Sequence, residues 1–184
     1  EAQMARLQNR IRDGQPSTAD IQEAIARYRG ELAYIDQQVG RLIQAMPPRP
    51  HLVVVFGDHG EMLGEDPAHP FGHGADVDLP LIHVPLIFSG LNLPVKVVEE
   101  SVGLMDVGPT LAALLGADPL GGGQDLRPLW TGGPWEDRPL FSEATQPESE
   151  TRHDAWPNLS LERSVIFQGH QFLFNPWIQD QKPQ

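Results

Sequence analysis

The chain has 184 residues, and 13 Lys and Arg stand against 25 Asp and Glu, which gives a net charge of -12. A composition that is 40% hydrophobic and 21% charged is typical of a globular protein and excludes a wholly disordered one. The absence of Cys excludes disulfides, a cysteine-ligated zinc site and a thiol nucleophile. No apolar run approaches the roughly 20 residues of a membrane span, so we expect no membrane contact by this stretch.

The charged residues are unevenly placed along the chain. Residues 1–50 carry seven Arg against six acids, whereas residues 51–184 carry six bases against nineteen acids. No Lys or Arg occurs between Arg49 and Lys96, in a stretch that holds most of the histidines. Nucleic acid, a polyanion, is therefore a poor partner, and this stretch suits a bound cation. An acidic, solvated loop is the alternative reading of the same composition.

The first long element is a predicted helix that starts near Ser17 and ends before a proline pair. Apolar residues recur in steps of four and three, which places them on one helix face. They are Ile21, Ile25, Tyr28, Leu32, Ile35, Val39, Leu42 and Met46. Asp20 and Glu23 have capping-box spacing. Gly30 and Gly40 each cost about 1 kcal/mol relative to Ala inside a helix, so we expect them to mark close packing against a neighbour.

This helix is followed by a continuous β-branched and aromatic run from His51 to Phe56. Such a run is typical of a strand buried on both faces of a parallel sheet. A helix laid along that sheet is the expected arrangement, and a coiled-coil partner helix is the alternative. Together these elements predict an α/β layered fold. Residues 61–80 lack periodicity and are expected to form one long loop.

Shorter elements complete the predicted fold. Residues 84–90 are predicted to form a strand, and residues 106–116 a short helix with an N-cap residue, an early Pro and a terminal Gly. The glycines at 121–123 lack the features of a phosphate loop and indicate a flexible link. A small C-terminal antiparallel sheet is predicted from short strands at 139–143, 163–168 and 170–174, the last two joined across Gly169 and His170.

Two adjacent residues after the first strand, Asp58 and His59, form half of a candidate metal site. Open α/β sheets usually carry their sites at the carboxyl ends of strands, and the flanking Gly57 and Gly60 permit a sharp turn there. An Asp oxygen with a His nitrogen suits zinc or manganese, and suits calcium when further carboxylates complete the sphere. The alternative is an Asp-His pair that simply caps a turn.

His73 stands between two glycines, where the backbone does not obstruct an approaching ligand. It is a candidate proton donor, substrate contact or further metal ligand, with a solvated loop histidine as the alternative. Glu61 and Asp66 are candidate hydrogen-bond partners that would orient the side chains of the site, with ordinary surface acids as the alternative. No Ser or Thr carries the signature of a nucleophile, and capping at a helix start is expected to explain Thr110 fully.

The order of these motifs resembles the C-terminal half of the sulfatase family, within the alkaline phosphatase superfamily. The matching segments are Tyr34-Ile35-Asp36-Gln37-Gln38-Val39-Gly40, Val54-Val55-Phe56-Gly57-Asp58-His59-Gly60-Glu61, Gly72-His73-Gly74, Val84-Pro85-Leu86-Ile87, Leu104-Met105-Asp106-Val107-Gly108-Pro109-Thr110-Leu111 and Gly123-Gln124-Asp125-Leu126. The resemblance implies that residues 1–130 are the C-terminal portion of an alkaline-phosphatase-like α/β/α sandwich. Residues 131–184 would then form a small, incomplete antiparallel subdomain.

The resemblance also implies roles for three residues. Asp58 and His59 would ligate a divalent metal ion, calcium first, with zinc or manganese as alternatives. His73 would contact the sulfate or protonate the leaving oxygen. The other acidic ligands and the nucleophile would come from the N-terminal half of the same protein. In the family this nucleophile is a formylglycine made in a Cys/Ser-x-Pro-x-Arg motif, which these 184 residues do not contain.

Two positions depart from the family pattern without removing a ligand: Gly57 stands where Ser is usual, and His83 stands where Arg is common. The resemblance predicts part of a metal-dependent sulfuric ester hydrolase for an anionic sulfate or phosphate ester, inactive as residues 1–184 alone. The base-free stretch agrees, because an anionic ester that meets no Lys or Arg there needs a bound cation.

Two alternative functions remain open at this point. A phosphoethanolamine or glycerophosphate transferase, or a phosphodiesterase, of the same superfamily would use similar ligands with a Thr nucleophile. A non-catalytic metal-binding or interaction domain is the other alternative. We expect a periplasmic or extracellular protein, with any membrane anchor outside these residues.

Overall fold

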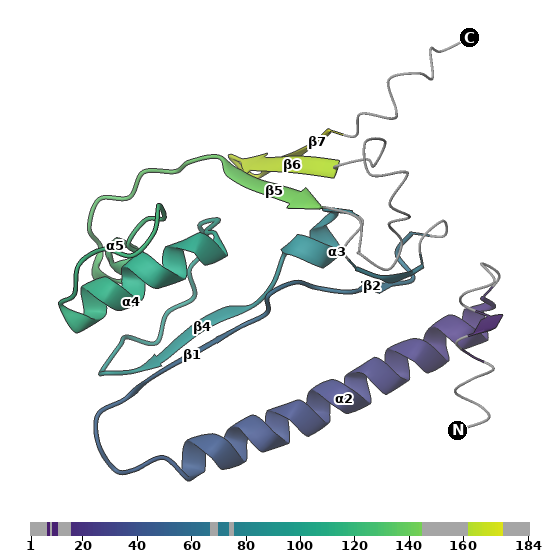
Figure 1. Ribbon diagram of the computed structural model, residues 1–184, viewed down its shortest axis with the longest axis horizontal. Coiled ribbons are helices and arrows are strands. Elements are labelled where there is room, and N and C mark those ends of the chain that lie inside the picture. The colour runs from purple at the N-terminus through teal and green to yellow at the C-terminus, as the bar shows by residue number, and fades with distance from the viewer. Residues whose placement is uncertain are drawn as a thin grey trace, which may run out of the picture. The chain divides into compact units, whose positions relative to one another are not determined.

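The computed structural model describes residues 7, 9–10, 16–66, 70–73, 76–144 and 162–174. Within this part of the chain the strands pair into three small antiparallel sheets (Figure 1). In the sequence a long helix precedes the strands, and shorter helices lie between some of them. The chain divides into two compact units, Glu1–His51 with Gly60–His73, and Leu52–His59 with Gly74–Gln184. The predicted mixture of helix and sheet is confirmed. The α/β/α sandwich and the boundary at residue 130 stay predictions.

The first unit is built on the long helix α2, Thr18–Gln44. Ser17 caps it in a capping box with Asp20. The Asp20 amide donates to the Ser17 hydroxyl at 3.3 Å, and the Asp20 carboxylate accepts from the Ser17 amide at 2.9 Å. The predicted helix is confirmed, but the expected box between Asp20 and Glu23 is wrong. Asp20 occupies the third helical position, so it closes the box rather than opening it.

Asp20 also forms an ion pair with Arg10. The Arg10 Nε donates to Asp20 Oδ1 at 2.8 Å, and Asp20 is only 5% exposed. The Arg10 guanidinium, followed by the hydroxyl and amide of Ser17, stabilises the carboxylate and lowers the pKa of Asp20 to about 2. The same hydrogen bond raises the pKa of Arg10.

No residue of the apolar face of α2 is buried, and three of them are exposed. Leu32, Ile35 and Leu42 are 48%, 53% and 69% exposed. A Cβ built at Gly30 or Gly40 would meet no atom within 4 Å. The expectation that these glycines mark close packing is therefore wrong for the described part of the chain.

The stretch expected as one long loop, residues 61–80, contains three short elements. Strands β2, Met62–Leu63, and β3, Phe71–Gly72, pair antiparallel in the first unit. Helix α3, Leu79–Ile82, follows in the second unit. The loop prediction is wrong at these positions, because strands of two residues are too short to show alternation in the sequence.

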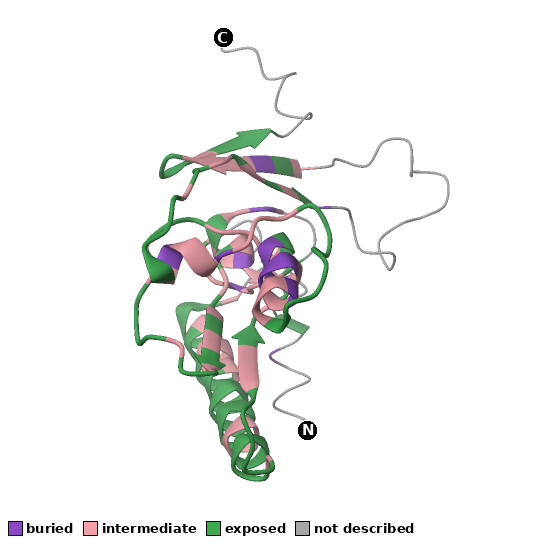
Figure 2. Cartoon of the chain, turned by 90° about the vertical axis from the view of Figure 1, so that its left-hand side faces the viewer, coloured by how far each residue is buried: buried purple, intermediate pink, exposed green. Residues whose placement is uncertain are grey.

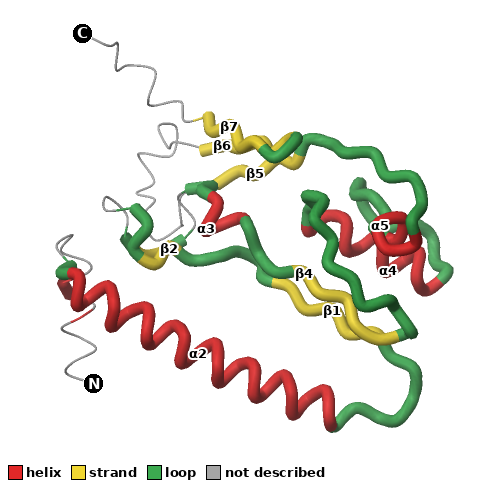
Figure 3. Tube along the Cα trace, turned by 180° about the vertical axis from the view of Figure 1, so that it is seen from behind, coloured by secondary structure: helices red, strands yellow, loops and turns green. Residues whose placement is uncertain are grey.

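The second unit contains strand β1, Leu52–Phe56, which ends beside Asp58 and His59. It pairs antiparallel with β4, Leu86–Gly90, and Figure 3 shows the two as one narrow ribbon. Both predicted strands are confirmed, but the parallel, doubly buried environment expected for β1 is wrong here. Val55 and Phe56 are 38% and 48% exposed. A continuous apolar run indicates that a strand tends to be buried, but it does not indicate whether the neighbouring strand is parallel or antiparallel.

Buried residues of the second unit gather on helix α4, Val107–Leu115 (Figure 2). The hydroxyl of the fully buried Thr110 donates to the Asp106 carbonyl at 2.6 Å and accepts from the Leu126 amide at 2.9 Å. It thereby ties α4 to α5, Arg127–Thr131. Contrary to expectation, helix capping does not account for the role of Thr110, because one of its hydrogen-bond partners, Leu126, lies sixteen residues away.

Asp106 is fully buried at the start of α4 and joins three segments. Its carboxylate accepts from the Gly103 amide at 2.8 Å, from the Gln124 amide at 2.7 Å and from the Arg138 guanidinium. The side chain therefore does not cap α4, although it stands at the N-cap position that the sequence indicated.

The third glycine of the 121–123 run packs against the backbone before α4. Gly123 lies so close to the 3-10 helix η1, Leu104–Asp106, that a Cβ would overlap the Met105 carbonyl oxygen. The prediction of a merely flexible link is wrong at this position, because only glycine permits so close a backbone approach.

The predicted C-terminal sheet is confirmed, with strands β5, Leu140–Ala144, β6, Glu162–Phe167, and β7, His170–Phe174, in that order. Gln168 and Gly169, at φ 49° and 74°, form the β6–β7 turn, one residue earlier than expected. No helix of the described residues is long and apolar enough to cross a membrane.

Candidate functional site

Asp58 and His59 lie in a bend directly after β1. Their side chains are 87% and 48% exposed, respectively. Asp58 Oδ1 accepts a hydrogen bond from the His59 amide at 3.1 Å, which stabilises the bend. Asp58 Oδ2 lies 4.0 Å from His59 Nε2. The structure therefore brings together the two atoms that the sequence predicts as metal ligands.

The ladder between β1 and β4 sets the position of this bend. The Gly57 amide donates to the Pro85 carbonyl at 3.2 Å, which extends the pairing by one residue beyond β1. A Cβ at Gly57 would lie 3.3 Å from the Val84 Cβ, closer than an ordinary van der Waals contact. Glycine at this position, one of the two departures from the resemblance, thus lets the end of β1 approach the start of β4.

The separation of the two atoms tests which cation the pair fits. Atoms 4.0 Å apart can share a cation only if the two metal–ligand distances add up to more than 4.0 Å. At roughly 2.4 Å each, in the calcium range, they do so in a bent arrangement. At roughly 2.1 Å each, in the zinc range, the angle between the two bonds would be about 145°, wider than the tetrahedral angle. The separation therefore fits calcium, whereas the imidazole donor by itself favours zinc or manganese.

Two donors leave a coordination sphere incomplete. Within the described ranges, no group of three or more His, Cys, Asp or Glu side chains is placed to hold a metal ion. Calcium takes six to eight oxygen ligands. Asp58 and His59 by themselves would therefore not complete the coordination sphere of such an ion.

His73 follows β3 in the first unit. Its Nδ1 lies 2.9 Å from Glu61 Oε2, and the two side chains are 50% and 24% exposed. The register explains this contact, because Met62 pairs with Gly72 and the next positions outward are Glu61 and His73. Glu61, one of the two candidate partners, thus contacts His73. A partly buried carboxylate that contacts one ring nitrogen of an imidazole holds the ring in one orientation.

The candidate residues belong to different compact units. Asp58 and His59 lie in the second unit, and His73 and Glu61 lie in the first. Each pair is therefore a separate local arrangement, one with metal-ligand atoms and one with a carboxylate-supported imidazole.

The remaining histidines show no comparable arrangement where the structure describes them. His51 Nδ1 lies 2.9 Å from the Arg49 carbonyl, and His170 Nδ1 lies 2.9 Å from the Gln168 carbonyl. His83 follows α3 and lines a cavity. His69 and His153 lie outside the described residues.

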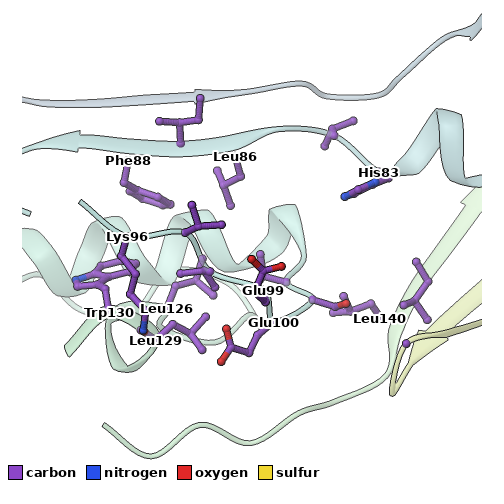
Figure 4. Close-up of a pocket in the computed structure, with 18 of the residues that line it drawn as sticks. His83, Leu86, Phe88, Lys96, Glu99, Glu100, Leu126, Leu129, Trp130 and Leu140 are labelled. Carbon is purple, nitrogen blue, oxygen red and sulfur yellow. The ribbon is translucent and has the colours of Figure 1, made fainter. Parts of the chain in front are cut away.

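The second unit also contains a cavity of about 740 Å³ (Figure 4). Its lining comes from β4, the segment 93–102, α5 and the C-terminal sheet, and it includes none of Asp58, His59 and His73. No sequence pattern indicates this cavity. Its lining residues are spread over residues 79–171 and become neighbours only through the fold.

The sulfatase family model matches residues 3–117, more than half of the chain. The matched part includes Asp58, His59 and His73. No curated protein matches the chain.

Proposed function

The chain belongs to the sulfatase family, and we propose that it forms part of a metal-dependent sulfuric ester hydrolase. Asp58 and His59 ligate a divalent cation, with calcium as the first candidate, and His73 protonates the oxygen of the departing alcohol. The observation that carries the proposal is the Asp58–His59 pair at the end of β1, inside the matched residues, with its ligand atoms 4.0 Å apart.

The charge distribution supports a cation at this place. A sulfate ester is anionic, yet no Lys or Arg occurs from residue 50 to residue 95. When bound, the cation would supply the positive field that holds an ester oxygen and stabilises the negative charge of the transition state. The exposure of Asp58 and His59 leaves their donor atoms accessible for this purpose.

The contact between His73 and Glu61 supports the role of the imidazole. Glu61 holds the ring at Nδ1 and so orients the imidazole that would donate the proton to the leaving oxygen. Glu61 acts through His73 and is therefore a positioning residue.

The remaining parts of the site belong to the same proposal. The other metal ligands and the nucleophile would come from the N-terminal half of a sulfatase, as would the rest of the α/β/α sandwich. The substrate is an anionic ester, sulfate rather than phosphate. A periplasmic or extracellular location, with any membrane anchor outside residues 1–184, completes the proposal.

Kinetics on two sulfate esters test the role of His73 in the protein expressed from its complete gene. The His73→Gln variant should lower kcat for phenyl sulfate by about 10²- to 10⁴-fold, the usual contribution of a general acid. The loss should be much smaller for 4-nitrophenyl sulfate, because 4-nitrophenolate leaves without needing a proton. His51→Gln, at an exposed histidine before β1, is the matched control and should leave both rates unchanged.

Two outcomes would contradict the proposal. Faster hydrolysis of 4-nitrophenyl phosphate or of a phosphodiester than of the sulfate esters would contradict the sulfatase activity and favour the phosphate-directed alternatives. An equal loss of rate for both sulfate esters in His73→Gln would contradict the proton-donor role and leave the activity itself unaffected.

A further inference from the structure

The cavity of the second unit has apolar, aromatic walls. The rings of Phe88 on β4 and Trp130 on α5 have centroids 5.7 Å apart and planes inclined at 42°. Leu126 and Leu129 also line it and are 3% and 5% exposed. Its volume of about 740 Å³ lies within the range typical of small-molecule sites. The cavity therefore has the size and lining of a pocket for a small organic molecule.

The α5 wall is fixed by contacts outside the cavity. The Leu126 amide donates to the Thr110 hydroxyl at 2.9 Å. The Arg127 guanidinium donates to Asp125 at 2.8 Å and to the Ala113 carbonyl at 3.1 Å. These bonds hold α5 against α4, and a wall fixed by the protein's own contacts lowers the ordering cost of binding.

Two carboxylates give this apolar lining a negative charge. Figure 4 shows Glu99 and Glu100 between the β4 wall and the α5 wall. Both residues are solvent-accessible, so a ligand can reach them. Lys96 lines the same cavity, but its ammonium donates to the Leu129 backbone carbonyl instead of to either carboxylate. Two carboxylates against one ammonium leave the lining with a net negative charge, which favours a cationic occupant.

We infer that this cavity binds a small organic cation, an ammonium group carried on an aromatic body. The body would lie against Phe88 and Trp130, and the ammonium would reach Glu99 and Glu100. Apolar burial supplies the attraction for the body, and charge complementarity selects the cation over a neutral or anionic molecule. No residue of the proposed hydrolase site lines the cavity, so this inference does not depend on the proposed function.

Three small molecules of similar shape test the inference on the protein expressed from its complete gene. They are 2-phenylethylammonium, 2-phenylethanol and phenylacetate, titrated at pH 8 to keep histidine charge out of the comparison. Chemical shifts of the Trp130 side chain, assigned with Trp130→Phe, report on occupancy. We expect saturable binding of the cation, at least tenfold tighter than that of the anion. Equal affinity for the three probes, or no saturable binding of the cation, would overturn the inference.

Charge-neutral variants identify the selecting groups. In the double variant Glu99→Gln with Glu100→Gln, affinity for the cation should fall about tenfold, since two partly exposed ion pairs are lost. Affinity for 2-phenylethanol should stay unchanged, which shows that the cavity is intact. The matched control is Asp118→Asn with Asp137→Asn, which removes two exposed acids that do not line the cavity. The same loss in this control, or an undiminished preference for the cation in the Glu99/Glu100 variant, would contradict the inference.

Discussion

His73 and Glu61 form a hydrogen-bonded pair, with His73 Nδ1 2.9 Å from Glu61 Oε2. They stand twelve residues apart and flank the two-stranded ladder of β2 and β3, whose Met62–Gly72 pairing brings them face to face. The pair thus depends on the hairpin, and the orientation of the proposed proton donor depends on the pair.

Removing the Glu61 charge should impair the reaction without abolishing it. Glu61→Gln is expected to lower kcat for phenyl sulfate by about 10- to 100-fold with little change in KM, because the imidazole loses its orienting carboxylate. The loss should be smaller for 4-nitrophenyl sulfate, and Glu61→Asp should restore part of the rate. Asp36→Asn, at an exposed acid of α2, is the control. A uniform loss for both substrates would indicate a structural role instead.

Asp20 should make the stability of the chain depend on pH in acid. Its pKa in the folded state is lowered to about 2, so its carboxylate stabilises the folded state fully above about pH 4. This contribution is lost as the pH falls from about 4 towards 2. Urea unfolding midpoints of wild type and Asp20→Asn should therefore differ at pH 6 and converge near pH 2. A difference that is constant over this range would contradict the assignment.

Gly30 and Gly40 of α2 should tolerate alanine. Gly30→Ala and Gly40→Ala are each expected to raise the free energy of unfolding by about 0.5–1 kcal/mol, because no atom lies within 4 Å of the new Cβ. Ala33→Gly, on the same helix, should lower it by a similar amount. Chemical denaturation measures all three. Destabilisation by either alanine would show that another surface packs closely against this helix.

Two neighbouring glycines should differ in how much stability they lose on substitution by alanine. Gly123→Ala is expected to destabilise the fold by about 1–3 kcal/mol, because its Cβ would overlap the Met105 carbonyl and displace rigid backbone. Gly122→Ala should change stability by no more than about 0.5 kcal/mol, since its nearest neighbour is the flexible end of Met105 at 4.0 Å. Thermal unfolding of the two variants compares them directly, and similar midpoints would refute this packing.

Local features of the fold could be predicted from the sequence. The periodicity of α2, the apolar run of β1 and the terminal Gly116 of α4 all indicate their elements correctly, because each signal lies within the element itself. The Asp58–His59 pair could be located for the same reason, since adjacency in sequence fixes adjacency in space.

Features that depend on distant contacts could not be predicted in this way. The direction of the strand beside β1, the requirement for Gly123 and the inward role of Thr110 depend on residues sixteen or more positions away. Glu61 could be named as a candidate partner, but its pairing with His73 required the short strands β2 and β3, which leave no periodic signal. The cavity could not be predicted from the sequence either, because its lining residues come from distant parts of the second unit.

Metal content tests the central claim most directly. The protein expressed from its complete gene, with Asp58→Asn and His59→Gln made in parallel, would be dialysed against buffer containing calcium, manganese and zinc and analysed by elemental mass spectrometry. His51→Gln is the matched histidine control. We expect about one equivalent of a divalent cation, calcium first, in wild type and the control, and a large loss in both ligand variants. Equal metal content in all four proteins would contradict the assignment of Asp58 and His59 as ligands.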